Sequence, residues 1–183
     1  MPIENVTFNS DGLKLVGHLY IPENVKPPYP CIVMGGGWCY VKELIQPEYA
    51  QFLADAGYAA LSFDYRNLGE SEGKIRQHIN PWEQIDDLIN AVTYVCERED
   101  VDDNRIGIWG VSLGGYYAPR AAAFEERIKA CISLTGPFDF AEAFDRAPEL
   151  TRQAFIARSH SKTASMAKKL ATKMNLSSVA SEI

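Results

Sequence analysis

The chain has 183 residues, of which 46% are hydrophobic and 11% aromatic, an ordinary composition for one globular domain with a sizeable core. Eighteen Lys and Arg against 24 Asp and Glu give a net charge of −6, and no basic stretch could follow a phosphate backbone. No segment approaches the ~20 apolar residues of a membrane helix, and the N-terminus lacks a secretory signal pattern. We therefore expect neither a nucleic-acid partner nor a membrane association.

Cysteine and histidine positions argue against a disulfide framework and a metal centre. The cysteines at 31, 39, 96 and 131 have no short paired spacing, and Cys31 and Cys131 fall in apolar runs that predict buried strands. Reduced thiols in a cytoplasmic protein fit this pattern. The three histidines lie far apart, and none is spaced for ligation with a neighbouring Cys or carboxylate. The sequence predicts no metal and no cofactor.

The first predicted element is a hairpin. Residues 13–21 alternate between apolar and polar side chains, which is typical of a strand with one buried face, and the proline-rich stretch 22–30 ends the pattern. Together with residues 6–8, this strand is expected to form an antiparallel hairpin at the edge of a sheet.

The next elements alternate between strands and helices. Four apolar runs are continuous rather than alternating, which predicts strands buried on both faces: 31–34, 58–63, 106–109 and 130–134. Helical patterns lie between them at 48–56 and 82–96. This order predicts a mostly parallel sheet with helices on both faces. After Gly136, residues 140–156 and 163–174 have helical patterns with no intervening strand.

Residues 106–118 contain the pattern that carries the chemistry. A buried strand runs into the turn Gly110-Val111-Ser112-Leu113-Gly114 and then into a helix, which is the arrangement of a nucleophile elbow. The turn would hold Ser112 exposed with a strained, positive φ, and the backbone N–H of Leu113 could donate to an oxyanion at the helix N-terminus. The alternative is a serine that only caps the helix.

A second oxyanion donor is expected in the loop after the strand at 31–34. Gly35, Gly36 and Gly37 there let the backbone approach a ligand closely. The N–H of Trp38 is the first candidate for this donor and that of Gly37 the second. The alternative is a glycine turn needed only to leave the sheet.

With these motifs, the chain resembles the α/β-hydrolase superfamily over roughly residues 8–140. Val41-Lys42-Glu43 after the glycine loop and the segment 64–71, Asp-Tyr-Arg-Asn-Leu-Gly-Glu-Ser, are similar to motifs of that family. From Ala118 onward the chain is similar to the branch with 2,6-dihydroxypseudooxynicotine hydrolase and the fermentation/respiration switch protein, which act on esters or C–C bonds. Gly36 stands where relatives usually carry a histidine.

The resemblance implies a triad in the chain order serine, acid, histidine, with the last two after further strands. We therefore expect residues 1–138 to form the α/β-hydrolase core and 139–183 a helical cap segment, with the C-terminal strands absent from this chain. His160 is the only histidine after Ser112, and a surface role in the cap is its simpler interpretation. Asp139 could be a catalytic acid or, more simply, a helix N-cap. His18 and His78 match no catalytic position of the family.

Three functions fit the sequence. The leading hypothesis is a serine hydrolase that cleaves an ester, amide or C–C bond of a small, partly apolar molecule through an acyl-enzyme, incomplete in this chain. The second is an inactive, truncated scaffold that acts through interactions, and the third is an acyltransferase with the same acyl-enzyme. In each case we expect a second polypeptide or another copy of the chain to cover the open sheet edge beside residues 130–134.

Overall fold

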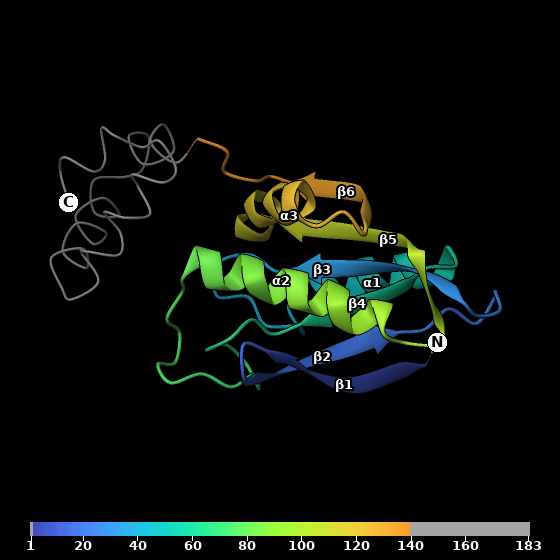
Figure 1. Ribbon diagram of the computed structural model, residues 1–183, viewed down its shortest axis with the longest axis horizontal. Helices are drawn as coiled ribbons and strands as arrows, with labels where there is room; N and C mark the ends of the chain where they lie inside the picture. Colours follow the sequence, from blue (N-terminus) through green and yellow to red (C-terminus); the bar gives the residue numbers. More distant parts are fainter. Residues whose placement is uncertain (1, 140–183) are drawn as a thin grey trace, which may run out of the picture. The chain divides into compact units, whose positions relative to one another are not determined.

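The structure, a computed structural model, describes residues 2–139. These residues form one six-stranded sheet and three helices, all within the compact unit Met1–Gly136 (Figure 1). In chain order the elements are β1 (Ile3–Ser10), β2 (Leu13–Tyr20), β3 (Tyr29–Gly35), α1 (Gln46–Asp55), β4 (Ala59–Phe63), α2 (Pro81–Cys96), β5 (Val101–Val111), α3 (Leu113–Phe124) and β6 (Ile128–Leu134). The predicted helices at 140–156 and 163–174, the cap segment and His160 lie outside the described residues.

The predicted hairpin is confirmed. β1 and β2 pair antiparallel from Ile3 opposite Tyr20 to Ser10 opposite Leu13. Asp11 and Gly12 connect them with φ values of 52° and 83°, the left-handed pair of a tight turn that matches the twist of a hairpin. β2 then pairs antiparallel with β4, so the hairpin extends the parallel part of the sheet on one side.

The parallel part is also confirmed, in the strand order β1-β2-β4-β3-β5-β6. β4, β3, β5 and β6 are parallel neighbours, so their carboxyl ends meet at one edge. That edge is where open α/β sheets place their ligands. Because β5 ends at Val111, Ser112 lies at this edge.

The prediction that all four parallel strands are buried on both faces is wrong for β6. Cys131 is exposed and Ile132 is 43% exposed, whereas β3 and β4 are buried over most of their length. The reason is the position of β6 at the end of the described sheet. Within residues 2–139 it pairs only with β5, and α3 is the helix that packs on it.

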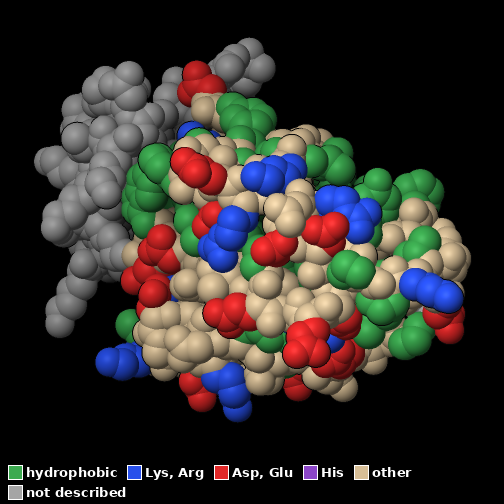
Figure 2. Space-filling model, turned by 45° about the vertical axis from the view of Figure 1, so that its right-hand side comes forward, with side chains coloured by type: hydrophobic (Ala, Val, Ile, Leu, Met, Phe, Trp, Pro, Cys, Tyr) green, Lys and Arg blue, Asp and Glu red, His purple; other side chains and the backbone are tan. Residues whose placement is uncertain are grey.

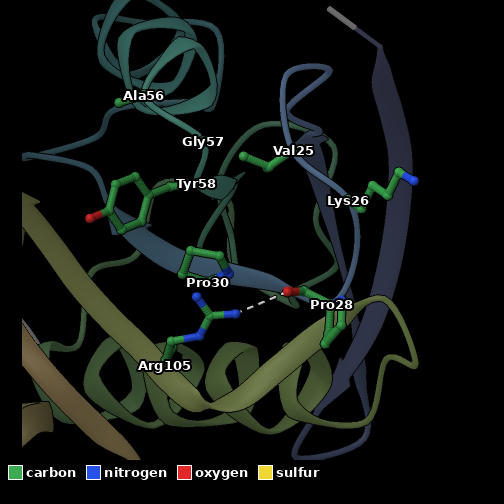
Figure 3. A pocket seen from close by; sticks show the side chains of 8 residues that line it. All are labelled: Val25, Lys26, Pro28, Pro30, Ala56, Gly57, Tyr58 and Arg105. Carbon is green, nitrogen blue, oxygen red and sulfur yellow. Dashed lines mark hydrogen bonds between the residues drawn. The ribbon is translucent and has the colours of Figure 1, made fainter.

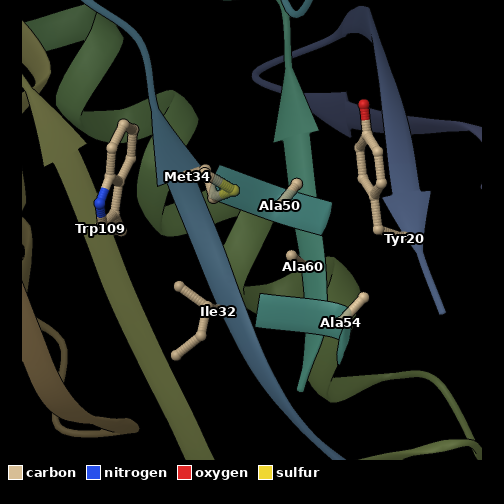
Figure 4. Packing of buried hydrophobic residues seen from close by; sticks show 7 residues of the cluster. All are labelled: Tyr20, Ile32, Met34, Ala50, Ala54, Ala60 and Trp109. Carbon is tan, nitrogen blue, oxygen red and sulfur yellow. The ribbon is translucent and has the colours of Figure 1, made fainter. Parts of the chain in front are cut away.

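Helices cover both faces of the sheet, as predicted: α2 and α3 lie on one face and α1 on the other (Figure 1). α2 begins where its sequence favours a start, with the side chain of Asn80 accepting from the N–H of Trp82 at 3.2 Å and Pro81 in the first turn. On the α1 face, Ala50 and Ala54 let the helix approach the sheet closely. They pack with Tyr20, Ile32, Met34, Ala60 and Trp109 (Figure 4).

The surface carries charges of both signs. Figure 2 shows acidic and basic side chains interspersed on one face, with hydrophobic side chains between them. Among the described residues, no helix combines the length and the apolar character needed to cross a membrane.

Candidate active site

Ser112 stands in the strained conformation expected of a nucleophile elbow. It separates β5 from α3 and has φ 54° and ψ −119°, so the predicted positive φ is confirmed. For a residue with a side chain, this region costs on the order of 1–3 kcal/mol and persists only where the surroundings enforce it. The enforcing contacts are a hydrogen bond of 2.9 Å from the Ser112 N–H to the Leu134 carbonyl and one of 3.2 Å from the Tyr116 N–H to the Ser112 carbonyl.

Glycines allow the strand, the helix and the loop after β3 to touch around Ser112. A Cβ on Gly110 would overlap the carbonyl oxygen of Gly114. A Cβ on Gly114 would in turn overlap the carbonyl oxygens of Gly35 and Gly36. The elbow and the glycine loop are therefore packed backbone against backbone, with no space for a side chain between them.

The glycine loop reaches Ser112 itself. A Cβ built on Gly37 would lie 3.2 Å from the Cβ of Ser112 and 3.1 Å from the ring of Tyr40. Leu113 is buried and is the first residue of α3, where backbone N–H groups lack partners within the helix. Ser112, Gly37 and Leu113 are thus brought together, and Trp38 follows Gly37 with its side chain 50% exposed. Which N–H groups bind an oxyanion stays a prediction.

The segment after the glycine loop is held by an ion cluster around the buried pair Lys42 and Asp64, which the sequence did not predict. Lys42 is 1% exposed, and its Nζ lies 3.0 Å from Asp64, 2.6 Å from Glu70 and 2.8 Å from Glu43. The backbone N–H of Lys42 also donates to Asp64 Oδ1 at 2.8 Å. Burial alone lowers the pKa of Lys42, but hydrogen bonds to the three carboxylates outweigh it and raise the pKa well above its usual range.

A second buried cluster lies at Arg66, two residues after Asp64. The guanidinium of Arg66 donates to Asp87 Oδ1 from Nε at 2.9 Å and from Nη2 at 2.7 Å. Ser10 donates to the same carboxylate at 2.6 Å, and Asp11 accepts from Arg66 at 2.8 Å. Burial raises the pKa of Asp87, although the hydrogen bonds from Arg66 and Ser10 oppose it. This cluster joins the hairpin, the segment after β4 and α2.

The other candidate residues do not complete a triad within residues 2–139. There, the Ser112 hydroxyl has no side-chain hydrogen-bond partner. His18 lies on β2 opposite Ser62. His78 precedes α2, and its carbonyl accepts from Asn67 at 3.1 Å. Asp139 is the last described residue.

A hollow lies at the end of the sheet opposite Ser112. Val25, Lys26, Pro28, Pro30, Ala56, Gly57, Tyr58 and Arg105 line it (Figure 3). Pro28 and Pro30 lie at the start of β3, the opposite end from the glycine loop, and Arg105 donates to the Pro28 carbonyl at 3.0 Å. No serine, cysteine, histidine or carboxylate contributes to this lining.

The sheet order and the elbow define an α/β-hydrolase, and comparisons with known proteins agree. The crystal structure of the alpha/beta hydrolase GrgF from Penicillium sp. sh18 matches with a TM-score of 0.75 and 28% identity, covering 94% of this chain and 55% of that one. The structure of 2,6-dihydroxy-pseudo-oxynicotine hydrolase matches with a TM-score of 0.70 and 29% identity, covering 83% and 42%. The predicted resemblance to this hydrolase is confirmed.

The X-Pro dipeptidyl-peptidase (S15) family matches residues 11–177, and the chain belongs to this family. Thiohydrolase aneE of Aspergillus aculeatus is 43% identical over 124 residues, which cover 68% of this chain and 38% of the relative. Polyketide transferase grgF of a Penicillium species is 33% identical over 140 residues, covering 76% and 47%. The chain spans less than half the length of these curated relatives.

Proposed function

We propose that Ser112 is the nucleophile of a hydrolase that works through an acyl-enzyme. The observation that carries this proposal is the positive φ of Ser112 with the backbone of Gly37 packed against its Cβ. In this mechanism the hydroxyl of Ser112 attacks a carbonyl carbon and its proton passes to a histidine. The N–H groups of Leu113 and of Trp38 or Gly37 hold the oxyanion that forms. The histidine and the acid come from outside residues 2–139.

The substrate we propose is a small, partly apolar ester, amide, ketone or thioester. We include thioesters because the relative aneE is named a thiohydrolase. A thiolate is a better leaving group than an alkoxide or an amine. Cleavage of a thioester therefore depends least on the general acid that protonates the leaving group. The exposed Trp38 beside the loop offers an apolar surface to such a molecule.

The test is hydrolysis of an aryl ester and an aryl thioester by the chain alone and by a longer form that carries the family's C-terminal part. We expect the longer form to be active and S112A to lose at least about 10³-fold in kcat. Ser133→Ala is the matched control, because its hydroxyl lies near the elbow and donates only to the Gly115 carbonyl at 2.7 Å. Equal activity of S112A and the unchanged protein would show that Ser112 is not the nucleophile.

Two alternatives predict different outcomes of the same assay. An inactive scaffold would bind a partner and hydrolyse neither ester in either form. An acyltransferase, which the name polyketide transferase of the relative grgF supports, would consume the thioester faster when an alcohol or amine acceptor is added. It would release the acylated acceptor in place of the free acid.

We also propose that a strand from a second polypeptide, another copy or the C-terminal part covers β6. The outer edge of β6 has no paired strand within residues 2–139, and Ile132 on it is 43% exposed. A reducing, cytoplasmic location fits the four cysteines, which have no short paired spacing in the sequence. Sedimentation of the chain at several concentrations tests whether a second copy covers β6. A monomer at all concentrations would rule out this occupant.

A further inference from the structure

The glycine loop beside Ser112 is bordered by a buried amide that the mechanism above does not use. Gln46, the first residue of α1, is fully buried, and a Cβ on Gly36 would lie 2.6 Å from its Nε2. That nitrogen has no hydrogen-bond partner among the described residues, although an unpaired buried amide group costs about 1–3 kcal/mol. The amide is thus aimed at the backbone of the loop.

The hydroxyl of Ser62 connects this amide with Lys42. Ser62 Oγ lies 2.7 Å from Gln46 Oε1 and 3.1 Å from the Lys42 carbonyl oxygen, and Ser62 is fully buried on β4. A hydroxyl has one proton and cannot donate to both acceptors. If the amide of Gln46 turns by half a rotation, its nitrogen donates to Ser62 and Ser62 donates to Lys42. The amide oxygen then faces Gly36 as an acceptor.

The backbone of Lys42 is consequently held from two sides. Its carbonyl accepts from Ser62, and its N–H donates to Asp64 Oδ1 at 2.8 Å. Two residues earlier, the N–H of Tyr40 donates to the Gly37 carbonyl at 3.2 Å, and the ring of Tyr40 borders Gly37. Fixing Lys42 therefore limits how far Gly37 can move from Ser112.

We propose that Gln46, Ser62 and Lys42 are positioning residues that hold the backbone of residues 36–38 in the orientation needed for oxyanion binding. This inference rests on the proposed function, because the orientation matters only if these N–H groups receive an oxyanion. None of the three side chains touches the substrate. They act through the loop, whose glycines have no side chains of their own to fix it.

The first measurement is amide hydrogen exchange of Gly36, Gly37 and Trp38 by NMR in the full chain, which does not depend on catalysis. Gln46→Leu and Ser62→Ala each remove one member of the set. We expect these amides to exchange about three- to tenfold faster than the loss of global stability alone would cause. This factor corresponds to the free energy of one lost hydrogen bond.

Gln84→Leu is the matched control. Gln84 is an equally buried glutamine on α2, across the sheet from α1, and it accepts from Tyr117 Oη at 3.0 Å. The Gln84→Leu substitution should lower global stability. The amides of residues 36–38 should exchange no faster than this loss of stability accounts for. If Gln46→Leu and Ser62→Ala change these amides no more than Gln84→Leu does, the inference is overturned.

The second measurement is steady-state hydrolysis of the aryl thioester by the longer form. Weaker oxyanion binding should lower kcat of Gln46→Leu by about three- to tenfold with little change in KM. A rise in KM with kcat unchanged would overturn the inference. Failure of the proposed function looks different, because S112A would then react as fast as the unchanged protein. The exchange data would still decide whether Gln46 and Ser62 hold the loop.

Discussion

The two buried ion clusters begin two residues apart, at Asp64 and Arg66, and differ in what they hold. Asp64 binds Lys42 and so fixes the segment that leads from the glycine loop beside Ser112. Arg66 binds Asp87 and joins the hairpin to α2, and among the described residues none of its hydrogen bonds is with the glycine loop. We therefore expect similar chemistry to have two consequences: loss of the Lys42 cluster should affect stability and the site together, whereas loss of the Arg66 cluster should affect stability alone.

The largest effect is expected for Lys42→Met. It leaves the fully buried Asp64 without its cation, and removing one partner of a buried pair costs about 3–5 kcal/mol. Because the same lysine fixes the loop, kcat in the longer form should fall at least about tenfold in the molecules that remain folded. Urea denaturation and ester hydrolysis measure the two effects. Full activity per folded molecule would contradict the link to the site.

Arg66→Met should match Lys42→Met in stability and differ in activity. Asp87 is also fully buried, and we expect about 3–5 kcal/mol of lost unfolding free energy by the same reasoning. Activity per folded molecule and amide exchange at residues 36–38 should stay unchanged. If Arg66→Met slows the reaction as much as Lys42→Met does, the two clusters are not distinct in function.

Met34→Ala separates the loss of charge from the loss of packing. Met34 is fully buried in the core between the sheet and α1, so its truncation leaves a cavity and should cost about 2–5 kcal/mol. No charge changes, so the loss should be nearly independent of pH from 4 to 8. Urea denaturation at several pH values checks this, and a strong pH dependence would contradict it.

The smallest effect is expected at the partly exposed Arg98, which bonds Asp100 at 2.8 Å and Glu4 at 2.9 Å. The hydrogen bond from Arg98 lowers the pKa of Asp100. A lowered carboxylate pKa stabilises the fold above the ordinary value of 3.8, and this stability is lost as the pH falls through the lowered pKa. Arg98→Ala should therefore cost at most about 1 kcal/mol at pH 7 and less at pH 2.

Local patterns were enough to predict much of this fold. The alternation in residues 13–21 predicted the hairpin, and the glycines around Ser112 predicted its positive φ, because both depend on neighbours in the chain. The exposure of β6 could not be predicted, since an apolar run does not reveal whether another element covers it. The contact between Lys42 and Asp64 joins residues 22 apart, and only the pairing of β3 with β4 brings them together.

The backbone contact between the elbow and the glycine loop also limits what sequence change the protein tolerates. A methyl group on Gly114 would meet two carbonyl oxygens that cannot yield without moving the loop, so a saturation library at this position should retain glycine alone. Gly12 is the opposite case, because nothing lies within 4 Å of a Cβ there and only its φ of 83° favours glycine. Asparagine and aspartate should survive selection at position 12. Two glycines that look alike in the sequence would thus evolve at very different rates.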